Sequence, residues 1–234
     1  MSDPGAPDAR VRGSAVLVHG LWGFPDDWQW VKRLLEAENI LVATPDLPSE
    51  RSTSAGLAQD ADEVRQAIRS CVPPVVVVGW SHGGPVISVG AAGESSVVRL
   101  IYIGEIPRRE IEDSSWIYDD PNVRVGGDGA VRLVEDWWRK DEATRLFTGV
   151  VADYLNRVGR RPASLATLTD PQTAAAWEAI PTTVLIGRDD SVSEDDVRWA
   201  LNNLSDVRFI ESDHFIIFRH PRSVADLVLE SFGR

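Results

Sequence analysis

The sequence lacks several features on which secreted and membrane proteins rely. Its 234 residues include one cysteine, Cys71, so no intramolecular disulfide can form and the fold cannot depend on one. The longest apolar stretches, such as Val75–Val78, are far shorter than the ~20 residues that span a bilayer. The N-terminal segment lacks the basic residues and apolar run of a secretory signal. We therefore expect a soluble, cytoplasmic protein.

Positive charge is also scarce. Lysine and arginine together number 24 against 36 acidic residues, which gives a formal net charge of −12. Nucleic acids and anionic membrane surfaces both select proteins with a basic surface. No local basic run compensates for the overall balance, so neither is an expected partner. We interpret the acidity as a contribution to solubility. The sequence does not specify an oligomeric state.

What the chain does contain indicates an α/β fold. Hydrophobic residues make up 43% of it, enough for a full buried core. Almost entirely apolar short runs alternate with helical patterns, which is typical of parallel strands buried on both faces. The predicted strands are Ala15–Val18, Ile40–Thr44, Val75–Gly79, Leu100–Ile103, Thr183–Ile186 and Val207–Ile210. The predicted helices are Asp27–Ala37, Ala55–Ser70, Pro85–Ala92, Glu194–Leu201 and Ser223–Ser231. We predict a six-stranded, mostly parallel, doubly wound sheet.

One region interrupts this alternation. The segment 107–177 contains no convincing strand and is too long, at about 70 residues, for a simple loop. It holds Trp116, a glycine-rich turn at 126–129, and a helical pattern through Trp137, Trp138 and Tyr154. We predict a helical cap over the edge of a core formed by residues 1–106 and 178–234. The alternative is that the segment only adds packing to the core.

The strongest chemical signal is Gly79-Trp80-Ser81-His82-Gly83, which matches G-x-S-x-G. The predicted strand runs directly into the motif and a helix follows, which is the context that a nucleophile elbow requires. The chain must reverse within about two residues, which strains the backbone of Ser81, and the flanking glycines remove Cβ atoms that would clash. Ser81 then lies at a helix N-terminus, where negative charge is favoured. We predict that Ser81 is a nucleophile.

A second signal is His19-Gly20, which ends the first predicted strand. Acyl transfer develops an oxyanion that fixed N–H donors must meet. The backbone N–H groups of Leu21 and His82 are the predicted donors. His19 could instead be read as a catalytic base, but a structural hydrogen bond in the turn is the preferred interpretation.

A third signal is His214, which follows the last predicted strand. A serine nucleophile needs a base, and imidazole titrates near neutral pH. The chain has four histidines, of which His19 and His82 occupy motif positions. His220 precedes Pro221 at the predicted start of the final helix and is interpreted as a surface capping residue. His214 is therefore the predicted base, at the sheet edge where open α/β folds place their sites.

The carboxylate that would orient this histidine is ambiguous. Asp189 and Asp190 are adjacent in Gly187-Arg188-Asp189-Asp190, after the fifth predicted strand, and each could instead be a turn or capping residue. The chain order Ser, Asp, His is the expected one. Glu105 follows another strand at the same sheet edge and could also reach an imidazole. Asp46 is interpreted as a residue that braces its loop.

Together these motifs resemble the α/β-hydrolase superfamily, and most closely its compact branch of small esterases and hydroxynitrile lyases. The motifs that carry the resemblance are His19-Gly20 with Trp28 and Trp30, Pro45-Asp46-Leu47-Pro48, Gly79 to Gly84, Gly187 to Asp190, and His214. The family spacing Gly-x-x-Asp, counted from Gly187, implies Asp190 as the acid. Glu105-Ile106-Pro107 departs from the small or apolar residues usual there.

The resemblance implies a metal-free and cofactor-free serine hydrolase with Ser81, His214 and Asp190 as its triad. Its substrate would be a small carboxylic ester, cleaved through an acyl-enzyme. The aromatic residues expected to contact substrate are Trp22, Trp116, Trp137 and Trp138. Two alternatives remain: a lyase or carbon–carbon bond hydrolase that uses the same triad, and a non-catalytic ligand-binding protein of this fold.

The lyase alternative makes the first testable prediction. The related lyases use a lysine near the catalytic histidine to stabilise cyanide, and the only lysines here, Lys32 and Lys140, are distant from His214 in sequence. We expect mandelonitrile to be cleaved far more slowly than an activated ester. Cyanide release and nitrophenol release measured on one enzyme sample test this, and efficient cyanide release would contradict it.

Overall fold

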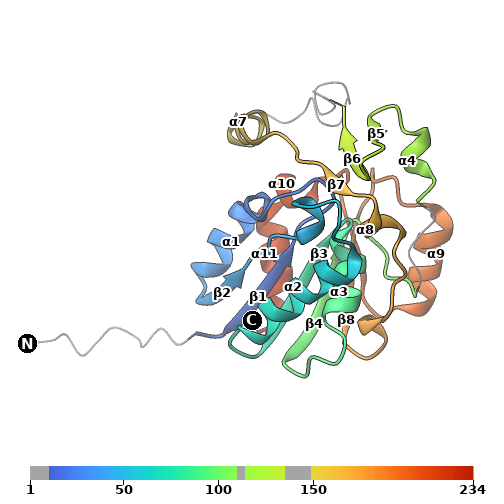
Figure 1. Cartoon of the computed structure of the whole chain (residues 1–234). Helices are drawn as coiled ribbons and strands as arrows, with labels where there is room; N and C mark the ends of the chain where they lie inside the picture. Colours follow the sequence, from blue (N-terminus) through green and yellow to red (C-terminus); the bar gives the residue numbers. More distant parts are fainter. Residues whose placement is uncertain (1–10, 110–113, 135–148, 234) are drawn as a thin grey trace, which may run out of the picture.

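The computed structural model describes residues 11–109, 114–134 and 149–233. Six strands form its central sheet, as predicted: β1 (Gly13–Val18), β2 (Ile40–Ala43), β3 (Val75–Trp80), β4 (Val97–Ile103), β8 (Thr182–Gly187) and β9 (Val207–Ile210). Their order is β2-β1-β3-β4-β8-β9, and every pairing is parallel (Figure 1). Every residue of β1, β3 and β8 is buried, which explains why these runs are apolar without alternation.

Helices cover both faces of the sheet. One face packs on α1 (Gln29–Glu36), α10 (Ile216–Arg219) and α11 (Pro221–Glu230). The other face packs on α2 (Leu57–Arg69), α3 (Gly83–Gly90) and α9 (Glu194–Asn203). Neighbouring residues of one strand therefore belong to different cores: Val76 and Val78 lie on the first face, Val75 and Val77 on the second. This is the doubly wound architecture that the sequence predicts.

The insertion between β4 and β8 differs from the prediction. It contains the helices α4 (Trp116–Asp119), α7 (Gly149–Val158) and α8 (Ala166–Thr169), and also a three-stranded antiparallel sheet. That sheet consists of β5 (Val123–Val125), β6 (Ala130–Leu133) and β7 (Ala163–Ser164). The expectation of a segment without strands was wrong. The glycine-rich turn at 126–129 joins β5 to β6, and the alternating Val-Arg-Val and Val-Arg-Leu on its two sides signal a hairpin.

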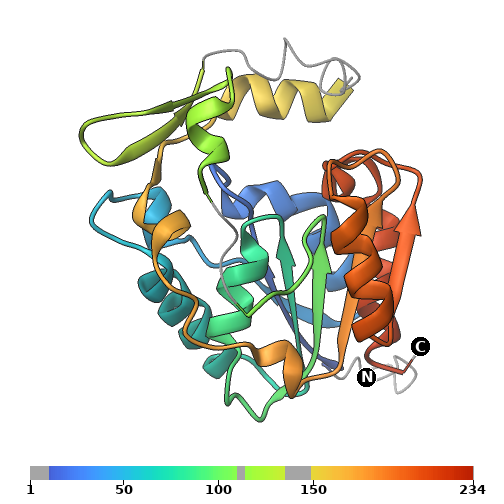
Figure 2. The same ribbon diagram turned by 90° about the vertical axis from the view of Figure 1, so that its right-hand side faces the viewer.

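Part of the predicted helical run lies outside the described residues. Trp137 and Trp138 belong to the segment 135–148, and only Tyr154, on α7, is described. Figure 2 shows the insertion above the carboxyl ends of the central strands. The described part of the chain contains no helix that is long and apolar enough to cross a membrane.

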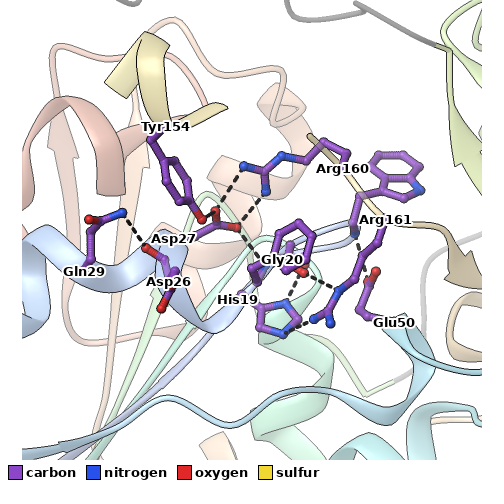
Figure 3. Close-up of polar contacts among 12 residues, drawn as sticks. His19, Gly20, Asp26, Asp27, Gln29, Glu50, Tyr154, Arg160 and Arg161 are labelled. Atoms are coloured by element: carbon purple, nitrogen blue, oxygen red, sulfur yellow. Dashed lines mark hydrogen bonds and ion pairs between the residues drawn. The ribbon is translucent and has the colours of Figure 1, made fainter. Parts of the chain in front are cut away.

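A buried charge ties the insertion to the core. Asp27 lies in the short helix η1 (Pro25–Trp28) and is completely buried. Its carboxylate accepts hydrogen bonds from the Tyr154 hydroxyl at 2.7 Å and from two nitrogens of Arg160 at 2.8 and 3.1 Å (Figure 3). Burial of a carboxylate is tolerated when its charge is paired and its oxygens are hydrogen-bonded. The contact therefore holds α7 and the segment after it against the core.

This contact predicts a stability effect. Tyr154→Phe removes one hydrogen bond to a charged group and leaves the ring in place, so we expect the free energy of unfolding to fall by about 1.5–3 kcal/mol. Tyr118→Phe is the matched control, since that side chain is 66% exposed. Urea titration of both variants and the wild type measures the difference. Equal stability of all three proteins would show that the hydrogen bond contributes nothing.

Candidate active site

Ser81 occupies a sharp turn between β3 and α3. Its φ is +53°, a left-handed conformation that side-chain-bearing residues rarely adopt. A Cβ at Gly79 would lie 2.5 Å from the Gly83 carbonyl oxygen, and one at Gly83 would lie 2.6 Å from that of Val18. Only glycine fits at these two positions. The N–H of Ser81 donates to Ile103 at 2.9 Å, which ties the turn to the end of β4.

His214 and Asp190 come together at the same edge of the sheet. The Nδ1 atom of His214 lies 3.1 Å from both carboxylate oxygens of Asp190, whose side chain is 1% exposed. The N–H of Ser191 donates to Asp190 at 2.7 Å, and the indole of Trp80 donates to the His214 carbonyl at 2.9 Å. These contacts fix the acid and the backbone that carries the imidazole.

Gly104 makes the acid–imidazole contact possible. It follows β4 with a φ of +60°, and a Cβ there would lie 3.0 Å from both Asp190 Oδ2 and His214 Nδ1. Sequence reasoning missed this residue. A single glycine after a strand is too common to signal a close approach between two distant side chains.

The other two carboxylates considered for the triad make different contacts. Asp189 is exposed, while its N–H donates to the Ser212 carbonyl at 3.0 Å. Glu105 lines the same cavity as His214, and its Oε1 accepts the N–H of Ile106 at 3.1 Å. Of the three, Asp190 is the one within hydrogen-bond distance of the imidazole.

The surroundings of His214 raise its pKa above the usual 6.5. Burial acts in the opposite direction, but it is outweighed by the hydrogen bond and charge of Asp190 and by the charges of Glu105 and Asp213. The neutral imidazole, which alone can accept a proton, therefore forms at a higher pH than in a free histidine.

Two backbone donors point to an oxyanion site. Leu21 and His82 both line the cavity beside Ser81, and neither N–H donates a hydrogen bond within the described part of the chain. Gly20 lets their two segments approach, because a Cβ there would lie 3.1 Å from the Cβ of Ser81. The predicted donors are thus on the same cavity wall as the predicted nucleophile.

His19 braces the loop that carries Leu21. It is completely buried, and burial lowers its pKa to about 4, so its ring is neutral. Its Nδ1 donates to the Gly20 carbonyl at 3.0 Å, while Nε2 accepts from the Leu47 N–H at 3.4 Å. Arg161 donates to the Gly23 carbonyl at 2.8 Å and pairs with Asp46. Both His19 and Asp46 therefore stabilise loops, as their sequence positions suggested.

Trp22 and Trp116 line the cavity and contact each other edge to face, with ring centroids 6.5 Å apart. Trp22 has a φ of +61°, its indole donates to the Val131 carbonyl at 3.0 Å, and its N–H donates to Glu50 at 2.9 Å. Glu50 is almost completely buried, and burial raises the pKa of its carboxyl well above the usual value. Sequence reasoning missed Glu50, since one acidic residue beyond Pro48 carries no signal.

The cavity between the sheet and the insertion has a volume of about 560 Å³, within the range of small-molecule sites. Ser81, His214 and Asp190 line it with apolar side chains from the core and the insertion: Leu21, Trp22, Ile106, Trp116, Leu168 and Phe215. Carboxylates of Glu105, Asp120 and Asp196 also reach it. Arg108, which pairs with Asp196 at 2.5 Å, is the one permanent cation among the described lining residues.

Comparison with known proteins identifies the family of the chain. The model of the alpha/beta hydrolase family matches residues 15–227. The chain belongs to the alpha/beta hydrolase family. The resemblance drawn from the motifs is thus confirmed at the level of the superfamily, and the match spans both the core and the insertion.

Individual relatives share this architecture. The alpha/beta hydrolase nvfD of Aspergillus novofumigatus (strain IBT 16806) is 26% identical over 250 residues, covering 95% of this chain and 98% of the relative. Tomato methylketone synthase I in complex with 2-tridecanone is similar in structure, with a TM-score of 0.77, 15% identity, and coverage of 94% and 98%. A pyrethroid hydrolase from Sphingobium faniae JZ-2 has a TM-score of 0.72, 17% identity, and coverage of 94% and 96%. At these identities, the solved structures establish the shared fold.

The acid can be tested by three variants assayed side by side on one ester. Asp190→Asn should lower kcat by about 10⁴, because the imidazole loses its orientation and the stabilisation of its charged form. Asp189→Asn should change kcat by less than about tenfold, because that side chain faces solvent. Glu105→Gln should retain activity and move the acid limb of the pH–rate profile to lower pH, because it removes a charge that raises the pKa of His214. A nearly unchanged kcat in Asp190→Asn would contradict the assignment.

Proposed function

We propose that this chain is a serine hydrolase that cleaves small carboxylic esters through an acyl-enzyme intermediate. The observation that carries the proposal is the convergence of three features in one cavity. These are a serine on a strained turn, a histidine held by a buried aspartate, and two backbone N–H groups that have no acceptor among the described residues. Each is a requirement of acyl transfer, and the reading of them as one catalytic centre is our inference.

In the first step, His214 Nε2 removes the proton of the Ser81 hydroxyl as the oxygen attacks the ester carbonyl. The bond to Asp190 keeps the proton of the neutral imidazole on Nδ1, which leaves Nε2 free to act as the base. No hydrogen bond joins Ser81 to His214 in the described structure. Such contacts commonly tighten only when substrate binds.

The carbonyl oxygen gains negative charge as the tetrahedral intermediate forms. The N–H groups of Leu21 and His82 would stabilise that charge, each by roughly 2.7–4 kcal/mol if comparable to measured oxyanion donors. His214 then gives the proton to the leaving alcohol. A water molecule, deprotonated by His214, releases the acid from Ser81 in the second half of the reaction.

The cavity favours a compact, uncharged ester. Its volume of about 560 Å³ and the paired rings of Trp22 and Trp116 suit an apolar acyl or alcohol group. The carboxylates of Glu105 and Asp120 would repel an anionic substrate, whereas Asp196 is paired with Arg108. Solved structures of this fold include a pyrethroid hydrolase and an Arabidopsis methylesterase. Ester hydrolysis is therefore compatible with the architecture.

The lyase alternative has less support. Of the two lysines, Lys32 lies on α1 in an ion pair with Glu36, and Lys140 lies outside the described residues. The described lining of the cavity thus offers no lysine for a cyanide anion. Turnover of a simple ester would also separate an enzyme from a ligand-binding protein that has lost catalysis.

The nucleophile can be tested directly. Ser81→Ala should lower kcat on a nitrophenyl ester by about 10⁴ or more, while the fold remains intact. A fluorophosphonate should label Ser81 in the wild type and nothing in the variant, as read by mass spectrometry of the digested protein. Ser95→Ala is the control, because Ser95 is exposed on the turn before β4. Full activity in Ser81→Ala, or labelling of another serine, would refute the assignment.

A further inference from the structure

A chain of buried hydrogen bonds begins at the side chain of His82, the residue whose backbone N–H is a proposed oxyanion donor. His82 Nε2 lies 2.9 Å from the Thr167 hydroxyl, and that hydroxyl lies 2.8 Å from Asp60 Oδ2. The other oxygen of Asp60 accepts the N–H of Ser49 at 2.9 Å. Thr167 and Asp60 are completely buried and His82 is 8% exposed, so all three side chains are shielded from water.

The three residues come from different parts of the fold. His82 immediately precedes α3, Asp60 lies on α2, and Thr167 lies on α8 in the insertion. The strand β7, which precedes α8, is itself held to the core, because the Ser164 hydroxyl donates to the Thr53 carbonyl at 3.1 Å. Thr167 therefore reaches the catalytic turn from a segment whose position is fixed.

The direction of each hydrogen bond follows from the groups present. A carboxylate only accepts, so the Thr167 hydroxyl donates its single proton to Asp60. The hydroxyl oxygen must then accept a proton from His82, which places that proton on Nε2. Burial lowers the pKa of His82, so its ring is neutral at physiological pH and carries one proton in a defined position. Each bond polarises the next, which stiffens the chain.

From this geometry we infer that Thr167, backed by Asp60, is a positioning residue for the oxyanion donor. By holding the imidazole of His82, it fixes the backbone N–H of the same residue in the orientation that the developing oxyanion needs. The insertion would then complete the catalytic centre as well as cover it. This inference rests on the proposed function, because it concerns how that function's oxyanion is stabilised.

Three variants separate positioning from simple packing. Thr167→Val keeps the shape of the side chain and removes the hydroxyl, whereas Thr167→Ser keeps the hydroxyl. Thr169→Val is the matched control, because Thr169 is exposed on the same helix and its hydroxyl donates only to the Leu165 carbonyl. Each is assayed for kcat and KM on a nitrophenyl ester, for thermal stability, and for affinity toward a trifluoromethyl ketone, which forms an oxyanion on Ser81.

Thr167→Val should lower kcat by about 10- to 100-fold with little change in KM, less than the loss of a whole oxyanion donor because the N–H remains. Its affinity for the trifluoromethyl ketone should fall by a similar factor, since that ligand mimics the transition state. Thr167→Ser should stay within about threefold of the wild type, and Thr169→Val should match it.

Two outcomes would overturn the inference while leaving the proposed function intact. One is a Thr167→Val protein that is less stable but keeps its kcat and inhibitor affinity, which would indicate packing alone. The other is an equal loss in Thr167→Val and Thr167→Ser, which would show that the hydroxyl is not the cause. A wild-type protein inert toward esters and toward fluorophosphonate would instead refute the proposed function, and the inference with it.

Should Thr167→Val fail to fold, Asp60→Asn provides the test. Its single amide oxygen can replace only one of the two carboxylate oxygens, so either the Thr167 hydroxyl or the Ser49 N–H loses its acceptor, and the negative charge that polarises the chain is lost as well. We expect kcat to fall severalfold at unchanged KM, and affinity for the trifluoromethyl ketone to fall with it. An unchanged kcat in Asp60→Asn would overturn the inference.

Discussion

The reversal of the chain at Ser81 constrains the residues that can flank it and the position of the neighbouring strands. A positive φ at this residue is tolerated only because Gly79 and Gly83 leave room for the turn and because the Ser81 N–H is tied to β4. Gly83 in turn packs directly on the carbonyl of Val18, where β1 ends. The end of the strand that precedes Ser81 and the end of the strand that leads to Leu21 are therefore held together at one edge of the sheet, where both residues line the cavity.

Polar contacts join the insertion to this edge, together with apolar packing of Leu21 and Trp22 against the insertion. Asp27 accepts hydrogen bonds from Tyr154 and Arg160. Arg161 donates a hydrogen bond to the loop that follows β1, and Thr167 is hydrogen-bonded to His82. Buried charges and hydroxyls accept few geometries, because a misplaced partner leaves a polar group unsatisfied in a water-free site. Such contacts specify where the insertion lies relative to the core, and so they specify the shape of the cavity.

Acidic residues affect the cavity both by direct contact with His214 and by their charge from farther away. Asp190 lies within hydrogen-bond distance of His214, orients the ring and raises the pKa of the imidazole. Glu105 and Asp213 act through their charge alone and raise it further. Asp120 adds negative charge to the cavity lining, while the charge of Asp196 is paired with Arg108. The cavity is thus acidic, like the chain as a whole, and this would favour uncharged substrates. The same charges raise the pH at which the imidazole of His214 becomes neutral.

Local patterns in the sequence were enough to determine the sheet, the turn at Ser81 and the edge where His214 lies. A strand that is buried on both faces contains almost no polar residues, and a tight turn requires glycine at particular positions. Both features can therefore be recognised in a few consecutive residues. The strand β7 has only two residues and therefore leaves little signal, whereas the hairpin of β5 and β6 does leave one, in the alternating residues around its glycine-rich turn. Only the tertiary structure decided that Asp190 faces the imidazole while its neighbour Asp189 faces solvent, that Gly104 makes room for them, and that Thr167 reaches His82 across 85 residues of sequence. Each of these depends on the distance between segments that are remote in the chain, and one sequence contains no local signal for such distances.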